Sequence, residues 1–218
     1  MSDYIIGSDE CGYGSWAGPL FVCAYVAPAG WTVPGLNDSK KLSPNRRKAV
    51  YRELPLENAI VLSVSSEDID RFGAFKALIS AHTQAIHCLQ SRGYLSARVV
   101  VDGSLRLPDV PNAESIPKAD SLIPAVMAAS VVAKVNRDFL MQEMHLRYPE
   151  YGFNEHVGYG APRHMEALSV HGPCPIHRRS YRPIKELLNG SQRMVDPVPK
   201  GGPPVPHDAP SPAGDGAV

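Results

Sequence analysis

The sequence predicts a mixed α/β domain in which strands come first and helices alternate with them later. Apolar runs rich in β-branched residues lie at Tyr4–Ser8 and Leu20–Ala27, and apolar residues recur at helical spacing from residue 121 to about residue 147. The chain has 218 residues, of which 44% are hydrophobic, so it is long enough to bury one core. We therefore expect one sheet flanked by helices.

Each expected element follows from a local pattern. The first two strands are the apolar runs named above, joined by a glycine-rich stretch, and a third strand is expected at residues 58–66. A helix is expected to start at Ser43-Pro44, because proline is favoured in the first helical turn. The other expected elements are helical segments from residue 66 and over 75–89, strands at 98–102 and 113–116, and the long helix that ends before Tyr148-Pro149.

Residues 189–218 differ from the rest of the chain in composition. They contain seven prolines and five glycines without a periodic apolar pattern. Proline at this density removes backbone donors and prevents helix formation. We expect a folded domain over residues 1–188 and a disordered tail over 189–218. The alternative for the tail is a proline-rich docking segment for a partner.

Composition and targeting signals restrict the classes of protein that remain. The formal net charge is zero, so composition alone does not indicate a nucleic-acid-binding protein. The four cysteines show no C-x-x-C spacing, which suits a reducing compartment better than a disulfide framework or a zinc site. Neither a signal peptide nor an apolar stretch of about 18 residues is evident. We expect a cytoplasmic protein with no membrane segment.

Four acidic residues stand at the ends of predicted elements: Asp9, Glu10, Asp102 and Asp120. If the first and fourth strands are adjacent and parallel, Asp9 and Asp102 share one edge of the sheet, where ligands gather in open α/β sheets. Such a cluster of like charges is unstable without cations. Hard oxygen ligands favour Mg²⁺ or Mn²⁺ over zinc. We expect two such ions, a pair that activates water for attack on a phosphodiester.

The first two acids raise a geometric problem, because adjacent residues of a regular strand point to opposite faces. Asp9 and Glu10 cannot both face the same ions if the strand continues past them. Because Gly12 and Gly14 follow closely, we expect the strand to end here. The alternative is that Asp9 is an ordinary acid at a strand end and that Glu10 is solvated.

Basic residues cluster in residues 38–52, where Asp38 is the one acid among six basic side chains. They form either a phosphate-binding patch or the solvated face of a helix. The six are Lys40, Lys41, Arg46, Arg47, Lys48 and Arg52. Lys118 either contacts a phosphate or offsets local negative charge. We expect Asp138 in a structural salt bridge, and His156 in hydrogen bonds that fix the following loop rather than in a zinc site.

Five ordered motifs between residues 4 and 184 resemble those of the ribonuclease HII family. The family pattern opens with D-E-x-G-R-G-x-x-A-G-P, which DECGYGSWAGP resembles here, and continues with D-S-K-K-L-S, V-D-G, and K-x-D followed by A-A-S-x-x-A-K-V-x-R-D. The late segments YGFNEHVGYGAPRH and GPCPIHRRSY are also close to the family pattern. The first four motifs match residues 9–19, 38–43, 101–103, and 118–120 with 128–138.

The resemblance implies a ribonuclease H-like fold, a mixed sheet flanked by helices with a C-terminal helical and loop segment. It implies a metal-dependent endoribonuclease that hydrolyses the RNA strand of RNA–DNA hybrids and incises duplex DNA on the 5′ side of embedded ribonucleotides. We expect it to act as a monomer. The implied metal ligands, for Mg²⁺ or Mn²⁺, are Asp9, Glu10, Asp102 and Asp120. The implied substrate-binding residues are Gly12, Tyr13, Gly14, Lys40, Lys118 and Tyr159.

The chain departs from the family pattern at Tyr13, where the family has arginine. In the family this loop brings backbone groups to the ribose 2′-hydroxyl, and Gly12 and Gly14, which permit close approach, are both present. Tyr13 removes a phosphate contact and offers stacking or one hydroxyl instead. The family's tyrosine that stacks on the sugar corresponds to Tyr159. Two other functions stay open: a nuclease of the same fold that cuts all-DNA substrates, and a hybrid-binding protein with weakened activity.

Overall fold

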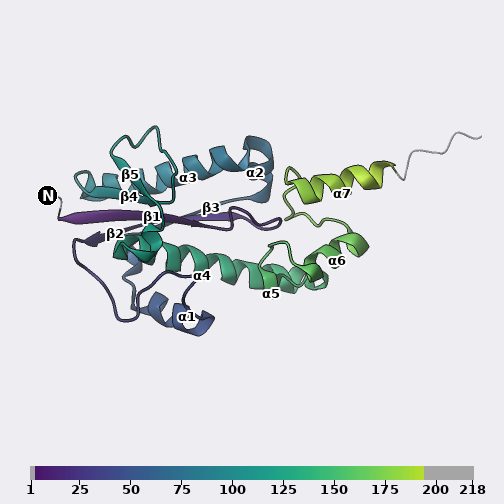
Figure 1. The fold of residues 1–218 in the computed structure, drawn as a ribbon, viewed down its shortest axis with the longest axis horizontal. Helices are drawn as coiled ribbons and strands as arrows, with labels where there is room; N and C mark the ends of the chain where they lie inside the picture. Colours follow the sequence, from purple (N-terminus) through teal and green to yellow (C-terminus); the bar gives the residue numbers. More distant parts are fainter. Residues whose placement is uncertain (1–2, 194–218) are drawn as a thin grey trace, which may run out of the picture.

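The computed structural model describes residues 3–193 and shows a five-stranded mixed sheet with helices on both faces (Figure 1). The strand order is β3-β2-β1-β4-β5, in which β1 pairs antiparallel with β2 and parallel with β4. The strands are β1 (Tyr4–Cys11), β2 (Leu20–Pro28), β3 (Ala59–Val64), β4 (Arg98–Asp102) and β5 (Ala113–Ile116). The helices are α1 (Pro44–Glu53), α2 (Ser66–Phe72), α3 (Ala74–Leu89), α4 (Pro124–Arg147), α5 (Phe153–His156), α6 (Pro162–His171) and α7 (Arg182–Arg193). The expected fold class is confirmed.

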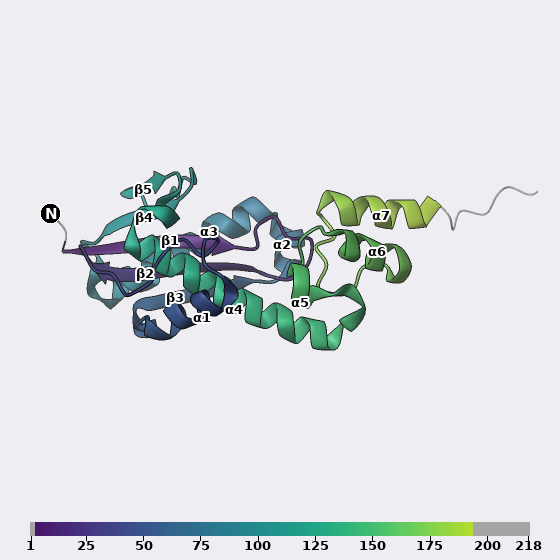
Figure 2. The ribbon, with the colours of Figure 1, turned by 60° about the horizontal axis from the view of Figure 1, so that its bottom comes forward.

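The helices form three groups around the sheet. Helices α2 and α3 cover one face, α4 with α1 behind it covers the other, and α5, α6 and α7 gather beyond one end of the strands (Figures 1 and 2). Strand β2 is apolar on both sides: Cys23 and Tyr25 belong to the core with α4, while Ala24 and Val26 belong to the core with Ile86 of α3. Burial of both faces is the reason that β2 shows a continuous apolar run in the sequence.

Strand β1 is longer than the glycines after it suggest. Its pairing with β2 continues as far as Cys11, so Asp9 pairs with Cys23 and Glu10 with Val22. The expectation that the strand ends at the acids is therefore wrong. Pairing with β2 keeps the backbone extended, and the chain leaves the strand only at Gly12, whose φ is +90°.

Two boundaries late in the chain also differ from expectation. Helix α4 starts at Pro124 and not at Ser121, because Ala119–Ser121 forms a separate 3₁₀ turn. Helix α7 passes Asn189 and ends at Arg193, so it crosses the boundary expected after residue 188. The rest of the predicted tail lies outside the described residues. None of the helices in residues 3–193 has the length and apolar character needed to span a bilayer.

Helix α4 packs unusually close to β1 at Gly7. A Cβ atom built on Gly7 would lie 2.3 Å from the backbone carbon of Ala125 and 2.3 Å from the backbone nitrogen of Val126. Both contacts are with backbone, which cannot move aside as a flexible side chain could. The close approach of α4 to the sheet therefore depends on a glycine at this position.

We expect Gly7→Ala to lower the free energy of unfolding by about 3 kcal/mol, because the added methyl group overpacks the contact between strand and helix. Urea denaturation checks this. Gly14→Ala is the matched control, since a Cβ atom built on Gly14 would have no atom within 4 Å and the stability of this variant should stay near that of the parent. Equal unfolding free energies for the two variants would contradict the prediction.

Candidate active site

Three separate segments bring the four predicted acids to one edge of the sheet. Strands β1 and β4 are parallel neighbours, and Ser8 pairs with Val101. One step further along both strands places Asp9 beside Asp102. Asp120 lies in the 3₁₀ turn after β5, and its backbone N–H donates to Oδ1 of Asp102 at 3.2 Å. The condition under which Asp9 and Asp102 share one edge, parallel pairing of the first and fourth strands, is therefore met.

Asp9 and Glu10 approach this edge from opposite faces of β1, as the continued strand requires. Asp9 is buried and lines the same cavity as Ser130 of α4. Oε2 of Glu10 lies 3.5 Å from Nε2 of His82 on α3. The hydroxyl of Ser8 donates to the carbonyl of Cys23, so Nδ1 of His82, 2.7 Å away, donates to Ser8. Both acids nevertheless line one cavity of about 260 Å³ with Asp102, since the pairing of β1 with β4 ends at Ser8 and both acids follow it.

Like charges and burial strain this arrangement. Burial raises the pKa of Asp9 to about 8, and the charges of Glu10 and Asp102 add to the rise. Burial also raises the pKa of Asp102, with contributions from Asp120 and Glu10. Each carboxylate therefore disfavours the ionised form of its neighbours. A divalent cation would reverse this effect, because it stabilises every carboxylate that reaches it.

Lys40 places a cation among these acids. Its Nζ lies 3.0 Å from Oδ2 of Asp120. Burial opposes a rise in the pKa of Lys40, but the hydrogen bond and charge of Asp120 raise it.

Within residues 3–193, no three acidic, histidine or cysteine side chains converge closely enough to enclose a metal ion. The donors are carboxylate oxygens, a set that fits Mg²⁺ or Mn²⁺. Asp9, Glu10, Asp102 and Asp120 are the residues that would hold them.

The predicted basic stretch divides into two parts. Lys40, Lys41 and Lys118 line a cavity of about 370 Å³ with Asp102 and Asp120, and are available to a phosphate there. Arg47 is different, because its buried guanidinium donates to the carbonyls of Ser39 and Leu42 and pairs with Asp138. Arg47 is therefore neither a phosphate contact nor part of a solvated face. Lys134 also pairs with Asp138, so the structural salt bridge expected there is confirmed.

Two buried arginines, which the sequence motifs contain without indicating their role, shape the glycine-rich loop. Arg137 donates to the carbonyls of Pro19, Ala17 and Val157, and a Cβ on Gly12 would lie 2.0 Å from its Nε. Arg178 donates to the carbonyls of Gly18 and Tyr13. The carbonyls therefore point inward to the two arginines, and the Tyr13 and Gly14 amides donate to no acceptor in the described part of the chain.

Tyr159 lines the same cavity as this loop. The Arg137 guanidinium lies 5.5 Å from the centroid of its ring. Nδ1 of His156 accepts from the Gly158 amide at 3.2 Å, so the expected role of His156 in fixing this loop is confirmed. The structure brings Gly12, Tyr13, Gly14, Lys40 and Tyr159 to the cavity with the acids and places Lys118 in the adjoining one.

A chain of hydrogen bonds through two buried histidines, His164 and His177, holds the carbonyl of Tyr159. Nδ1 of His164 donates to the carbonyl of Tyr159 at 2.9 Å, so its Nε2 is an acceptor. Nε2 of His177, 2.9 Å away, is then the donor, and its Nδ1 accepts from the Cys174 amide. Burial lowers the pKa of both histidines to about 4. The chain holds together only while both rings are neutral.

The model of the family described as Ribonuclease HII matches residues 6–184. This chain belongs to the ribonuclease HII family. The relative from Ralstonia nicotianae is 40% identical over 201 residues, covering 90% of this chain and 84% of the relative. The membership confirms the expected class of enzyme, a metal-dependent endoribonuclease.

Solved structures agree with the fold. Ribonuclease H2 from Pyrococcus horikoshii is similar with a TM-score of 0.69 and 23% identity, covering 87% of this chain and 99% of that one. Bst-RNase HIII in complex with Mn²⁺ is similar with a TM-score of 0.68 and 20% identity, covering 88% of this chain and 71% of that one. At these identities the likeness shows that the ribonuclease H-like arrangement is shared.

We expect His164 and His177 to reduce the free energy of unfolding as the pH is lowered from about 6.5 to about 4, against the opposite contribution of Asp9, whose pKa of about 8 keeps it protonated in the folded chain. In this range His164 and His177 take up protons in the unfolded chain but stay neutral in the folded one, so unfolding binds protons and acid favours it. Urea denaturation at several pH values measures the slope. His177→Gln should make it shallower, whereas the exposed His171→Gln should not. An unchanged slope in His177→Gln would contradict the assignment.

Proposed function

We propose that this ribonuclease HII hydrolyses the RNA strand of RNA–DNA hybrids and incises duplex DNA on the 5′ side of embedded ribonucleotides, with two Mg²⁺ or Mn²⁺ ions. The observation that carries the proposal is the meeting of Asp9, Glu10, Asp102 and Asp120, drawn from three segments, at one edge of the sheet. The proposed substrate, a duplex, approaches the protein at this edge of the sheet.

The proposed roles follow from position. When bound, the metal ions supply an activated water and stabilise the leaving oxygen. The acids hold the ions, and the unpaired amides beside Gly12 are available to the ribose 2′-hydroxyl that distinguishes RNA from DNA. Tyr159 is 39% exposed in the same cavity and packs on the sugar.

Lys40 and Lys118, which line a second cavity beside Asp102, bind phosphates of the substrate. The side chain of Lys40 is 74% exposed even though its ammonium pairs with Asp120, so it contacts a phosphate without leaving the site. Lys118 lines the cavity of about 370 Å³ together with Lys40, Asp102 and Asp120. Because this binding replaces counterions along the nucleic acid, we propose that it weakens as salt is raised.

We expect Asp102→Asn to lower Mg²⁺-dependent nicking of a duplex with one ribonucleotide by about a thousandfold, since a neutral amide is a poor ligand and several kcal/mol of charge stabilisation are lost. Unfolding by heat should remain cooperative. Asp109→Asn is the matched control, because Asp109 is exposed on the connection that follows β4. Nicking by Asp102→Asn at the parent rate would refute the proposal, and cleavage of all-DNA duplexes by the parent would favour the alternative nuclease.

A further inference from the structure

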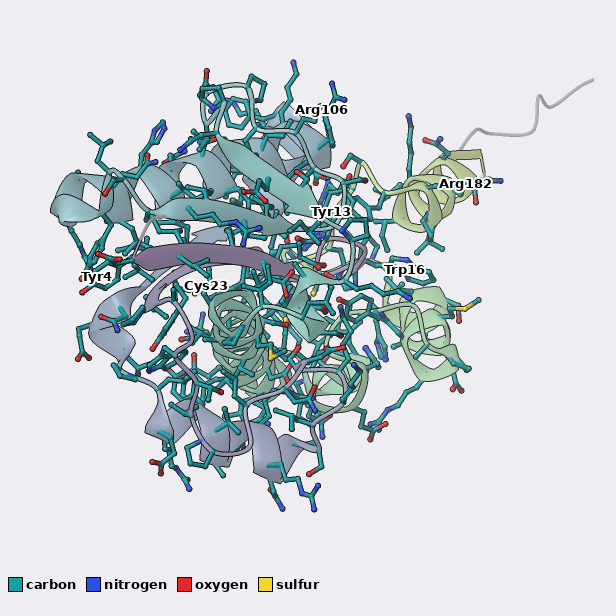
Figure 3. The ribbon with its side chains drawn as sticks, turned by 60° about the vertical axis from the view of Figure 1, so that its left-hand side comes forward. Tyr4, Tyr13, Trp16, Cys23, Arg106 and Arg182 are labelled. Carbon is teal, nitrogen blue, oxygen red and sulfur yellow. The ribbon has the colours of Figure 1, made fainter. Side chains whose placement is uncertain are left out.

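A groove of about 580 Å³ starts at the proposed metal ligands and runs between the first turns of α3 and the connection from β4 to β5. Glu10 and Asp102 line one end of it, and Tyr13 lines both this groove and the cavity that holds the glycine-rich loop. In Figure 3 Tyr13 lies near the end of β1, and Arg106 lies on the connection above it. The groove is thus continuous with the candidate active site.

The two sides of Asp102 differ in chemistry. The cavity on one side contains Lys40, Lys41 and Lys118. The groove on the other side has mainly apolar walls, including Leu78, Ile79 and Leu105, and its basic residue is Arg106. Phosphates are favoured on the lysine side, whereas the apolar side suits the uncharged parts of a nucleotide.

Two exposed aromatic rings are placed in this groove. Phe75, in the first turn of α3, is 58% exposed, and Tyr13 is 38% exposed. Other phenylalanines are exposed as well, so exposure alone does not select these two. What distinguishes them is that they line the groove that Glu10 and Asp102 also line.

Hydrogen bonds to its backbone carbonyl hold Tyr13 in place. Its carbonyl accepts hydrogen bonds from Arg178, which is wholly buried, and from the hydroxyl of Tyr181. A ring on a restrained backbone loses little freedom when a ligand packs on it. This chain has the ring where the family pattern has a guanidinium, so the groove presents an aromatic surface where the family pattern presents charge.

We propose that Tyr13 and Phe75 form an aromatic subsite for the base and sugar of the nucleotide that flanks the cleaved phosphodiester, with Arg106 reaching the next phosphate. The inference rests on the proposed function. It assigns one flanking nucleoside and the phosphate that Arg106 reaches to the groove, and the other phosphate contacts to the lysine cavity.

The test compares kcat and KM for nicking of three duplexes, each with one ribonucleotide. One duplex is fully paired. In the other two, either the nucleotide 5′ of the cleaved bond or the ribonucleotide itself, which lies 3′ of that bond, keeps its sugar but lacks its base. We expect the parent to lose about tenfold in kcat/KM on one of the two abasic duplexes, because the apolar contact with the edge of one base is removed. Phe75→Ala should lower kcat/KM on the paired duplex by about tenfold, mainly by raising KM. In this variant the contact with the base is already lost, so removal of the base from the duplex should lower kcat/KM no further.

Phe72→Ala is the matched control, since Phe72 is 53% exposed on α2 and lies outside this groove. It should nick all three duplexes as the parent does. Phe75→Leu keeps an apolar side chain and removes the ring, so it should reproduce the loss even if the alanine variant is unstable. The inference is overturned if either Phe75 variant nicks the paired duplex like the parent or shows the parent's full abasic penalty. A parent chain that nicks none of the duplexes refutes the proposed function itself.

Discussion

Repulsion among carboxylates held side by side is the interaction around which the candidate site is arranged. The parallel register of β1 and β4 places Asp9 beside Asp102, and burial and these neighbours raise the pKa of Asp9 to about 8. The sheet tolerates this because apolar residues bury both of its faces, and that burial exceeds the local electrostatic cost. A divalent cation bound at this edge would relieve the repulsion, because it stabilises every carboxylate that reaches it.

The positive charges near this edge do two different things. Lys40 is largely exposed and paired with Asp120, so it offsets charge and remains free to meet a phosphate. Arg137 and Arg178 are wholly buried and donate mainly to carbonyls. A guanidinium has five fixed donors and turns several carbonyls inward at once. The two buried guanidinium groups therefore set the shape of the glycine-rich loop. The Tyr13 and Gly14 amides have no acceptor among the described residues and are the groups proposed to contact the substrate.

The sequence was informative wherever the signal was local. Local patterns placed Asp102 at the end of a strand and Asp120 before a helix. Their meeting with Asp9 depended on β1 and β4 being parallel neighbours, which no local pattern states. The end of β1 could not be placed from a local pattern, because glycines at 12 and 14 suggested an early stop, whereas pairing with β2 sustains the strand through Cys11. The burial of Arg137 and Arg178 was equally out of reach. Their partners in the glycine-rich loop lie more than a hundred residues away in the chain, and no local pattern records such contacts.

The formal net charge of zero has a spatial explanation. Acids gather at the end of β1 and β4, lysines lie on one side of Asp102, and aromatic and aliphatic side chains lie on the other. A strong overall positive charge would attract any nucleic acid, with little dependence on what lies at the site. In the proposed mode of binding, a substrate meets cations and an apolar groove at once. Recognition then depends on contacts at the cleaved bond more than on long-range attraction.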